Sequence, residues 1–179
     1  MTLAVPHQSR IDSPTQRLVM TILFAGALAT VAFDLFGQTI SPLLRDVAGP
    51  VLGAKLAPVP LATAVLSKFT GVPGKELAKL GLPYGLHILT GLIAYPLGWF
   101  LIVRPIWQRV ASALPWVLPA IAYGVGLWVF ALYGMAHLVA GNPPFLGFGT
   151  LTWVALIGHI IFALVAAWVI EWRHPQDRV

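Results

Sequence analysis

Four apolar stretches divide this chain, and each is long enough to cross a lipid bilayer as a helix. They cover residues 18–36, 82–103, 114–139 and 151–170. About 20 residues, rising roughly 1.5 Å each, cross a hydrocarbon core of about 30 Å. The 179-residue chain is 58% hydrophobic and 9% charged, whereas soluble globular domains contain about 25% charged residues. A backbone in lipid must satisfy its own hydrogen bonds. The sequence therefore predicts an all-α integral membrane protein with four transmembrane helices.

The connections predict how these helices are arranged. Successive membrane helices alternate in direction, which gives an up-down bundle over residues 18–170. A polar N-terminal segment, 1–17, precedes this transmembrane domain, and a polar, solvated tail, 171–179, follows it. The lipid bilayer is therefore the first partner expected for the chain.

The first connection, 37–81, is too long for a tight helix–helix turn and too apolar for a disordered linker. Prolines break it into short pieces at five positions: Pro42, Pro50, Pro58, Pro60 and Pro73. Residues 61–69 and 75–80 are expected to form short helices. The segment is predicted either to lie on the membrane surface or to form a re-entrant cap over the bundle. Either arrangement is favoured over a fifth span, because lysines and prolines interrupt every candidate window.

Each apolar stretch carries an ionisable residue near the same end of the expected bundle. Asp34 closes the first stretch, His87 opens the second, His137 closes the third, and His159 lies in the first half of the fourth. Since consecutive helices alternate in direction, all four residues fall in one leaflet. Charged side chains facing lipid are costly, so we expect these residues to point into the bundle.

Small and polar residues recur at steps of three and four, which marks the helix faces expected to meet inside the bundle. The four sets are Gly26, Thr30, Asp34 and Gly37; Tyr84, His87, Gly91, Tyr95 and Gly98; Tyr123, Gly126, Phe130, Gly134 and His137; and Thr152, Ala155, His159, Ala163 and Ala166. The pairs Ala25/Ala29 and Ala122/Gly126 have the small-xxx-small spacing of membrane helix contacts. Pro96 and Pro119 are expected to kink their helices.

The histidines are the candidate cofactor ligands. Histidine can ligate haem iron, bind a metal, pass protons or hydrogen-bond a quinone. We expect His87 and His159 to be the first ligands and His137 the next, with Asp34 orienting an imidazole. The depths of these histidines allow bis-His haem b, and the Ala155-xxx-His159 spacing also occurs where helices ligate bacteriochlorophyll. The identity of any metal stays open. Each residue also has a structural alternative: an interfacial or interhelical hydrogen bond for a histidine, and a turn cap or an ion pair for Asp34.

Several classes of site are excluded or unsupported. The chain contains no cysteine, which excludes disulfides, thiolate zinc sites, Cys-ligated iron–sulfur clusters and c-type haem attachment. The net charge of +5 comes from cations that flank the apolar stretches, and no basic stripe with interleaved aromatic residues supports nucleic-acid binding. No constellation for hydrolysis or nucleotide binding is present.

The distribution of arginine predicts the orientation in the membrane. The N-terminal segment, the second connection and the tail share one side of the bundle. They carry Arg10 and Arg17, Arg104 and Arg109, and Arg173 and Arg178, respectively. On the other side, the long first connection carries Arg45, Lys55, Lys68, Lys75 and Lys79, so the count alone decides little, whereas the third connection, 140–150, is short and uncharged. The uncharged third connection and the arginines of the second connection decide the orientation. Both termini are therefore expected to be cytoplasmic.

The chain resembles small bacterial four-helix inner-membrane proteins of uncharacterised function, the YagU-like type. The resemblance lies in residues 26–30 (GALAT) and 34–37 (DLFG), and in histidines followed by small residues at 87–91 (HILTG) and 158–163 (GHIIFA). It implies the fold and a bacterial inner-membrane location, and it transfers no catalytic residue. The long, proline-interrupted first connection departs from that type.

Three functional classes remain. The first is a non-catalytic accessory or scaffold subunit that assembles with other membrane protein subunits, since the chain has little extramembrane mass and no soluble catalytic domain. The second is a haem-, pigment- or quinone-binding electron-transfer subunit that uses the intramembrane histidines. The third is a small proton or cation transporter, which Asp34 and the histidines would serve. The sequence favours the first and leans against an enzyme.

Overall fold

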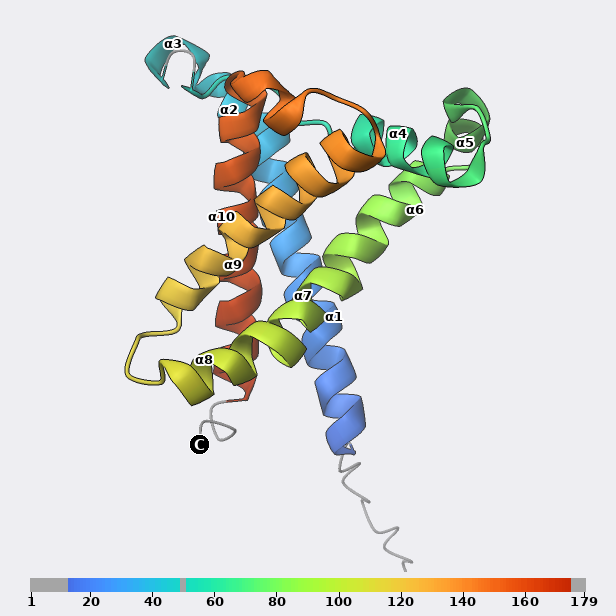
Figure 1. Ribbon diagram of the computed structural model, residues 1–179. Coiled ribbons are helices and arrows are strands. Elements are labelled where there is room, and N and C mark those ends of the chain that lie inside the picture. Colours follow the sequence, from blue (N-terminus) through green and yellow to red (C-terminus); the bar gives the residue numbers. More distant parts are fainter. Residues whose placement is uncertain (1–12, 49–50, 175–179) are drawn as a thin grey trace, which may run out of the picture.

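The computed structural model describes residues 13–48 and 51–174, and all regular structure within them is helical (Figure 1). Four helical runs are long and apolar enough to cross a membrane: Pro14–Leu43, Leu82–Val110, Val117–Val139 and Thr150–Arg173. The predicted all-α class and the four long apolar helices are confirmed. Three of the runs extend beyond the predicted apolar stretches. Their helices continue into the more polar residues that flank the apolar sequence.

Each run consists of one or more helical elements. The first contains α1 (Pro14–Leu35), η1 (Phe36–Ile40) and α2 (Ser41–Leu43). The second contains α6 (Leu82–Leu89), η3 (Thr90–Ala94), α7 (Tyr95–Gly98), η4 (Trp99–Val103) and α8 (Arg104–Val110). The third contains α9 (Val117–Val129) and η5 (Phe130–Val139), and the fourth is α10 (Thr150–Arg173). In Figure 1 the chain rises through α1, descends through α6–α8, rises again through α9 and descends through α10.

Three wide π-helical turns precede prolines. The segments η1, η3 and η4 each end two residues before a proline, at Pro42, Pro96 and Pro105. A proline inside a helix lacks the N–H donor, and its ring crowds the carbonyl four residues earlier. A wider turn relieves that crowding while the helix continues. Pro119 differs from the sequence prediction: it lies in the first turn of α9, where no preceding turn exists to be kinked.

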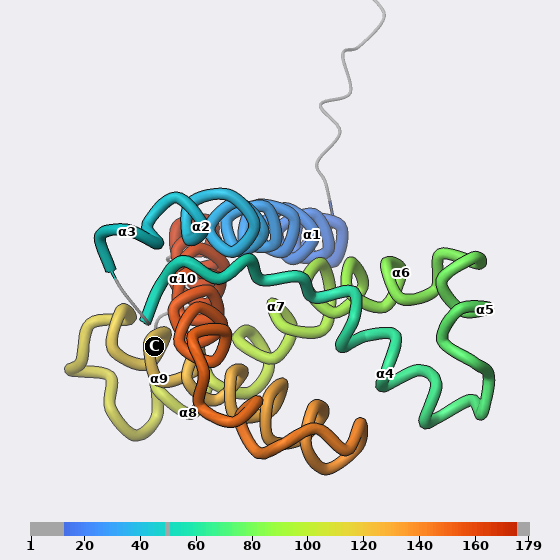
Figure 2. Tube along the Cα trace, turned by 90° about the horizontal axis from the view of Figure 1, so that it is seen from above, coloured from blue at the N-terminus to red at the C-terminus, as the bar shows by residue number. Residues whose placement is uncertain are grey.

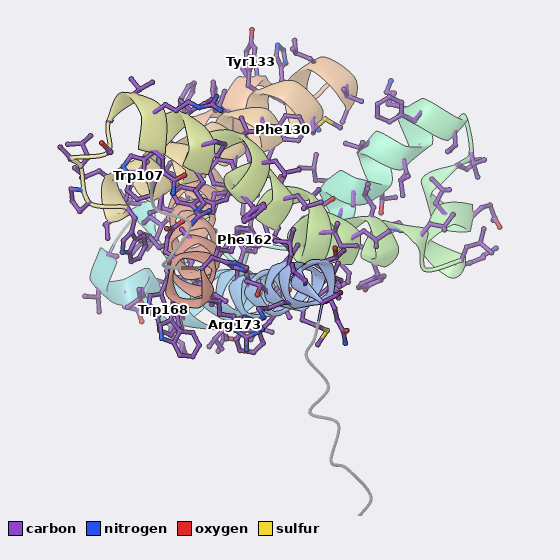
Figure 3. The ribbon with its side chains drawn as sticks, turned by 90° about the horizontal axis from the view of Figure 1, so that it is seen from below. Trp107, Phe130, Tyr133, Phe162, Trp168 and Arg173 are labelled. Carbon is purple, nitrogen blue, oxygen red and sulfur yellow. The ribbon has the colours of Figure 1, made fainter. Side chains whose placement is uncertain are left out.

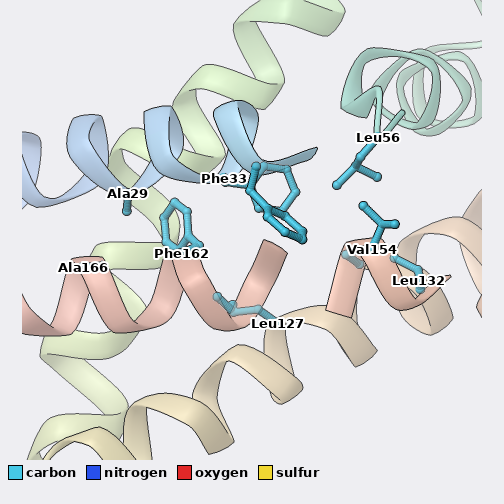
Figure 4. Packing of buried hydrophobic residues seen from close by; sticks show 11 residues of the cluster. Ala29, Phe33, Leu56, Leu127, Leu132, Val154, Phe162 and Ala166 are labelled. Atoms are coloured by element: carbon cyan, nitrogen blue, oxygen red, sulfur yellow. The ribbon is translucent and has the colours of Figure 1, made fainter. Parts of the chain in front are cut away.

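The tightest packing is between α1 and α10. Ala25 and Ala29 on α1 are fully buried, as are Ala163, Ala166 and Ala167 on α10. Figure 4 shows Ala29 and Ala166 facing each other across this contact, with Phe33 and Phe162 filling the space beside them. The predicted Ala25/Ala29 pair therefore lies at a helix contact, where small side chains let the backbones approach.

Glycines mark two further close contacts. A Cβ at Gly26 would overlap the backbone of Leu92, and a Cβ at Gly91 would overlap Thr30 Oγ1, so α1 lies directly against η3. On α9 the contact residue is Gly124, where a Cβ would stand 2.6 Å from Ile160 Cα of α10.

Three residues predicted to face the inside of the bundle are exposed instead. The pair Ala122/Gly126 is exposed, and the pair two residues earlier, Ala120/Gly124, is buried instead. The α9 stretch is apolar on all sides, so its sequence gives little indication of which side faces a neighbour. Tyr84, also expected inside, is 60% exposed, because the start of α6 extends beyond the other long helices.

The first connection forms helices at both predicted places. It contains α3 (Arg45–Ala48), α4 (Pro58–Thr70) and α5 (Gly74–Lys79). Viewed from above, α4 lies between α6 and η5 (Figure 2). Ser41 fixes the start of the connection: its Oγ donates to Ala54 O at 2.9 Å and accepts from Gly53 N at 3.3 Å. The two predicted arrangements, with α4 on the membrane surface or in a re-entrant cap, both stay predictions.

The third connection contains a left-handed turn. Phe145, Leu146 and Phe148 in η6 (Pro144–Phe148) have φ values of 48°, 54° and 56°. Such angles cost roughly 1–2 kcal/mol per non-glycine residue. The Phe145 ring lies against Trp128, with ring centroids 4.6 Å apart, and its carbonyl accepts a short hydrogen bond from the Thr152 hydroxyl. Aromatic stacking and a buried hydroxyl thus hold the turn in place.

The two glycines of α9 give a matched test of close helix packing. Gly124→Ala should lower the free energy of unfolding by about 1–3 kcal/mol, because the new methyl group would press on the α10 backbone. Gly126→Ala should leave stability unchanged or raise it by up to about 1 kcal/mol, because no atom lies within 4 Å of its Cβ position and alanine favours a helix. Reversible unfolding in mixed detergent micelles measures both. Equal effects of the two substitutions would contradict the α9–α10 contact.

Candidate functional site

A cavity of about 520 Å³ lies between α1, α4, η3, α7, η5 and α10. Ligand cavities in proteins commonly have volumes of roughly 300–1,000 Å³. Most of the lining is apolar, and α4 closes one side with Leu61, Ala62 and Val65. Small residues at Ala94 and Ala155 leave space that larger side chains would occupy. The cavity is thus a product of small residues on the long helices and of the short helix that covers them.

Aromatic side chains form part of the wall. Phe33 of α1 and Phe162 of α10 belong to the buried core and also line the cavity (Figure 4). Viewed from below, Phe162 lies toward the middle of the helices, whereas Trp168 on the same helix lies at the outer edge (Figure 3). One side of α10 therefore faces the cavity, and the other faces away from the protein.

Asp34 and His87 are in contact. His87 Nε2 lies 3.2 Å from Asp34 Oδ2, and the two side chains are 16% and 29% exposed. Gln38 Nε2 donates to the other carboxylate oxygen, Asp34 Oδ1, at 3.1 Å. The contact brings the end of α1 to α6, as expected if both residues lie in one leaflet. Asp34 therefore holds the His87 ring in one orientation, and His87 lines the cavity.

His159 is the most deeply buried of the candidate ligands, with 6% of its surface exposed. Its Nδ1 lies 2.7 Å from Ala155 O, one turn earlier in α10. The Phe33 ring packs edge-on against it at 5.1 Å, and the same ring lies 6.4 Å from His87. His87 and His159 therefore share one cavity, on either side of Phe33.

Two further polar residues line the same cavity. Tyr95 of α7 lies 6.3 Å from His159 between ring centroids, and its hydroxyl has no hydrogen-bond partner among the described residues. The Thr30 hydroxyl of α1 is buried and also has no partner within the described part of the chain. Both residues lie on helix faces that the sequence predicts to meet inside the bundle. A threonine or a tyrosine on such a face can equally be a packing residue, so the sequence alone did not identify either as a site residue.

His137 lies outside this group. Its Nδ1 lies 2.8 Å from Asn142 O in the third connection, and its ring lies 5.3 Å from that of Tyr133. It is not among the residues that line the cavity. His137 closes the end of η5 through this local hydrogen bond. A structural hydrogen bond of this kind is the alternative to ligand binding that was given for each histidine.

The cavity suits some of the candidate cofactors better than others. Haem b carries two propionate groups, and no lysine or arginine is found among the described lining residues to neutralise them. Within the described residues, no group of three or more His, Cys, Asp or Glu side chains could hold a metal ion. Phe33 also lies beside both imidazoles. An apolar lining without lysine or arginine among its described residues favours an uncharged ligand over a dianionic one.

A second polar cluster lies at the opposite end of α10. Arg104 Nε donates to Glu171 Oε1 at 2.8 Å, and the two side chains are 6% and 2% exposed. Trp99 Nε1 donates to the same oxygen at 3.4 Å, and Arg104 Nη2 donates to His174 O at 2.9 Å. Sequence reasoning placed Glu171 in a solvated tail, and this was wrong because α10 continues to Arg173 and turns Glu171 inward. Residues 175–179 of that tail lie outside the described residues.

The buried ion pair can be tested by a double-mutant cycle. Arg104→Met and Glu171→Leu should each lower the free energy of unfolding by about 3–5 kcal/mol, because each removes one half of a buried, hydrogen-bonded ion pair. The double variant should recover most of that loss. The exposed pair Lys79–Glu76, with 71% and 55% exposed side chains, is the matched control, and breaking it should cost less than about 1 kcal/mol. Additive losses at Arg104 and Glu171 would show that the two residues act independently.

Comparisons of this chain with protein-family models, with curated proteins and with solved structures find no match. The functional inference therefore rests on the chemistry of the cavity itself.

Proposed function

We propose that the protein is a non-catalytic accessory subunit of a membrane complex, and that it holds an uncharged, lipid-soluble small molecule in the cavity beside His87 and His159. One observation carries the proposal: an apolar cavity of about 520 Å³ whose polar residues converge from three separate helices. Largely apolar cavities with a few placed polar groups are typical ligand sites.

The charge of the lining supports an uncharged ligand. Asp34 already has His87 as its partner, and no lysine or arginine is found among the described lining residues. A charged ligand would therefore enter an apolar space without a counter-ion, which is costly. A quinone or a similar prenylated ring meets both conditions: its head group can hydrogen-bond, and its tail can occupy the apolar remainder.

The second helical run supports an accessory role. Only 17% of its most apolar window is buried within the protein. Large apolar side chains on this run, Leu89, Leu101 and Ile102, are 56%, 61% and 60% exposed. Such a surface suits lipid or the helices of other membrane subunits.

We place the protein in the bacterial inner membrane with both termini in the cytoplasm, as an up-down bundle. Two observations support this arrangement. The end of α10 lies beside the N-terminal half of α1, since His174 Nε2 is 3.3 Å from Thr21 Oγ1. Helix α8 and the end of α10, which carry the exposed Arg109 and Arg173, lie at the same end of the bundle (Figure 1), and arginines at one end favour a cytoplasmic face there.

The proposed function is tested by gentle purification of the full chain. Co-purifying small molecules are identified by mass spectrometry, co-purifying proteins are identified in parallel, and an optical scan detects haem or pigment. We expect an uncharged lipid-soluble molecule and no porphyrin absorption band. A haem spectrum would contradict the proposal, as would an empty cavity in protein purified from native membranes.

A cavity-filling variant tests the location of the ligand. Ala94→Phe should reduce the bound ligand roughly tenfold, equivalent to about 1.4 kcal/mol, because the ring would occupy the space that Ala94 leaves. Ala122→Phe is the matched control, because Ala122 is exposed on α9 and is not a lining residue. The amount of ligand per mole of purified protein is the measurement. Equal occupancy in both variants would place the ligand elsewhere.

A further inference from the structure

We propose that the cavity selects a hydroxyl-bearing ligand of the quinol class, whose O–H group donates a hydrogen bond to His159 Nε2. This inference rests on the proposed function, since it names the chemistry of the molecule held in the same cavity. It follows from which nitrogen atom of His159 carries hydrogen.

The surroundings of His159 fix its tautomer. Nδ1 lies 2.7 Å from the carbonyl oxygen of Ala155, and a carbonyl oxygen only accepts, so Nδ1 carries the hydrogen. The ring contacts of this histidine are with Phe33 and Tyr95. A charged imidazolium there would be buried without a carboxylate partner, which is costly. In the neutral ring, Nε2 is therefore a bare acceptor, and it has no hydrogen-bond partner among the described residues.

His87 differs from His159 because it has a carboxylate partner. Its Nε2 faces the Asp34 carboxylate at 3.2 Å, so Nε2 carries a hydrogen and is engaged by Asp34. The carboxylate is held in turn by Gln38. His159 is therefore the histidine whose bare acceptor nitrogen requires a donor from the ligand.

This requirement separates the two oxidation states of a quinone. The oxidised ring carries two carbonyl groups, which only accept hydrogen bonds, whereas the quinol carries two hydroxyl donors. Tyr95 can donate or accept, so either state satisfies its hydroxyl. Only the quinol satisfies an imidazole acceptor. The rings of Phe33, Tyr95 and Phe162 offer flat apolar surfaces to an aromatic head group.

Binding measurements on the full chain in lipid nanodiscs test the inference. The probes are decylubiquinol, decylubiquinone and the 1,4-dimethyl ether of decylubiquinol, all under anaerobic conditions. The ether keeps the ring and tail but lacks a donor. We expect the quinol to bind about tenfold more tightly than either other probe, the effect of roughly one hydrogen bond to a buried acceptor. His159→Phe should remove this preference while leaving binding of the ether unchanged.

Matched variants separate the hydrogen bond from general packing. His174→Phe makes the same change at the far end of α10 and should keep the preference for the quinol. Tyr95→Phe should weaken quinol and quinone alike, whereas Tyr84→Phe, at an exposed tyrosine, should weaken neither. Equal affinity for the three probes in the unaltered protein would overturn the quinol inference and leave the proposed function standing. No binding of any probe would overturn the inference, and absence of any co-purifying apolar molecule would overturn the proposed function as well.

Discussion

Close approach of helix backbones is the interaction on which the rest of this structure depends. Lipid tails are as apolar as leucine, so membrane helices associate through tight packing rather than through loss of contact with water. Here α1 meets η3 at Gly26 and Gly91, and α9 meets α10 at Gly124. These contacts fix the angles at which the long helices cross. The cavity lies where the helices then diverge, and α4 covers the opening.

The two ends of the bundle differ in character. At one end, small side chains and a covering helix leave a space lined by imidazole, phenol and hydroxyl groups. At the other, large side chains surround an ion pair: Trp99 is fully buried and Trp107 is 8% exposed. The dense end holds α1, α8 and α10 together, whereas the open end leaves room for the proposed ligand. The residues that maintain the shape of the bundle are therefore separate from the residues that line the cavity.

The sequence predicts the features that depend on the spacing of residues along the chain. It does not predict the features that depend on the rotation of each helix about its own axis or on the packing of side chains. Asp34 and His87 could be predicted to converge, because alternating helices bring the end of the first to the start of the second. Gly124 could not be distinguished from Gly126, because α9 is apolar all round and has no polar face to set its rotation. Glu171 was taken for part of a solvated tail, since a charge at a helix end usually reaches water. The cavity could not be predicted from the sequence, because it depends on how side chains from several helices fill the space between them.

The ion pair between Arg104 and Glu171 also bears on how the protein is made. The two residues are 67 positions apart, so Arg104 leaves the ribosome well before Glu171. The contact between them therefore cannot form until the last helical run has been synthesised. The ion pair joins the second run to the last one, and so links two parts of the chain that are made at different times.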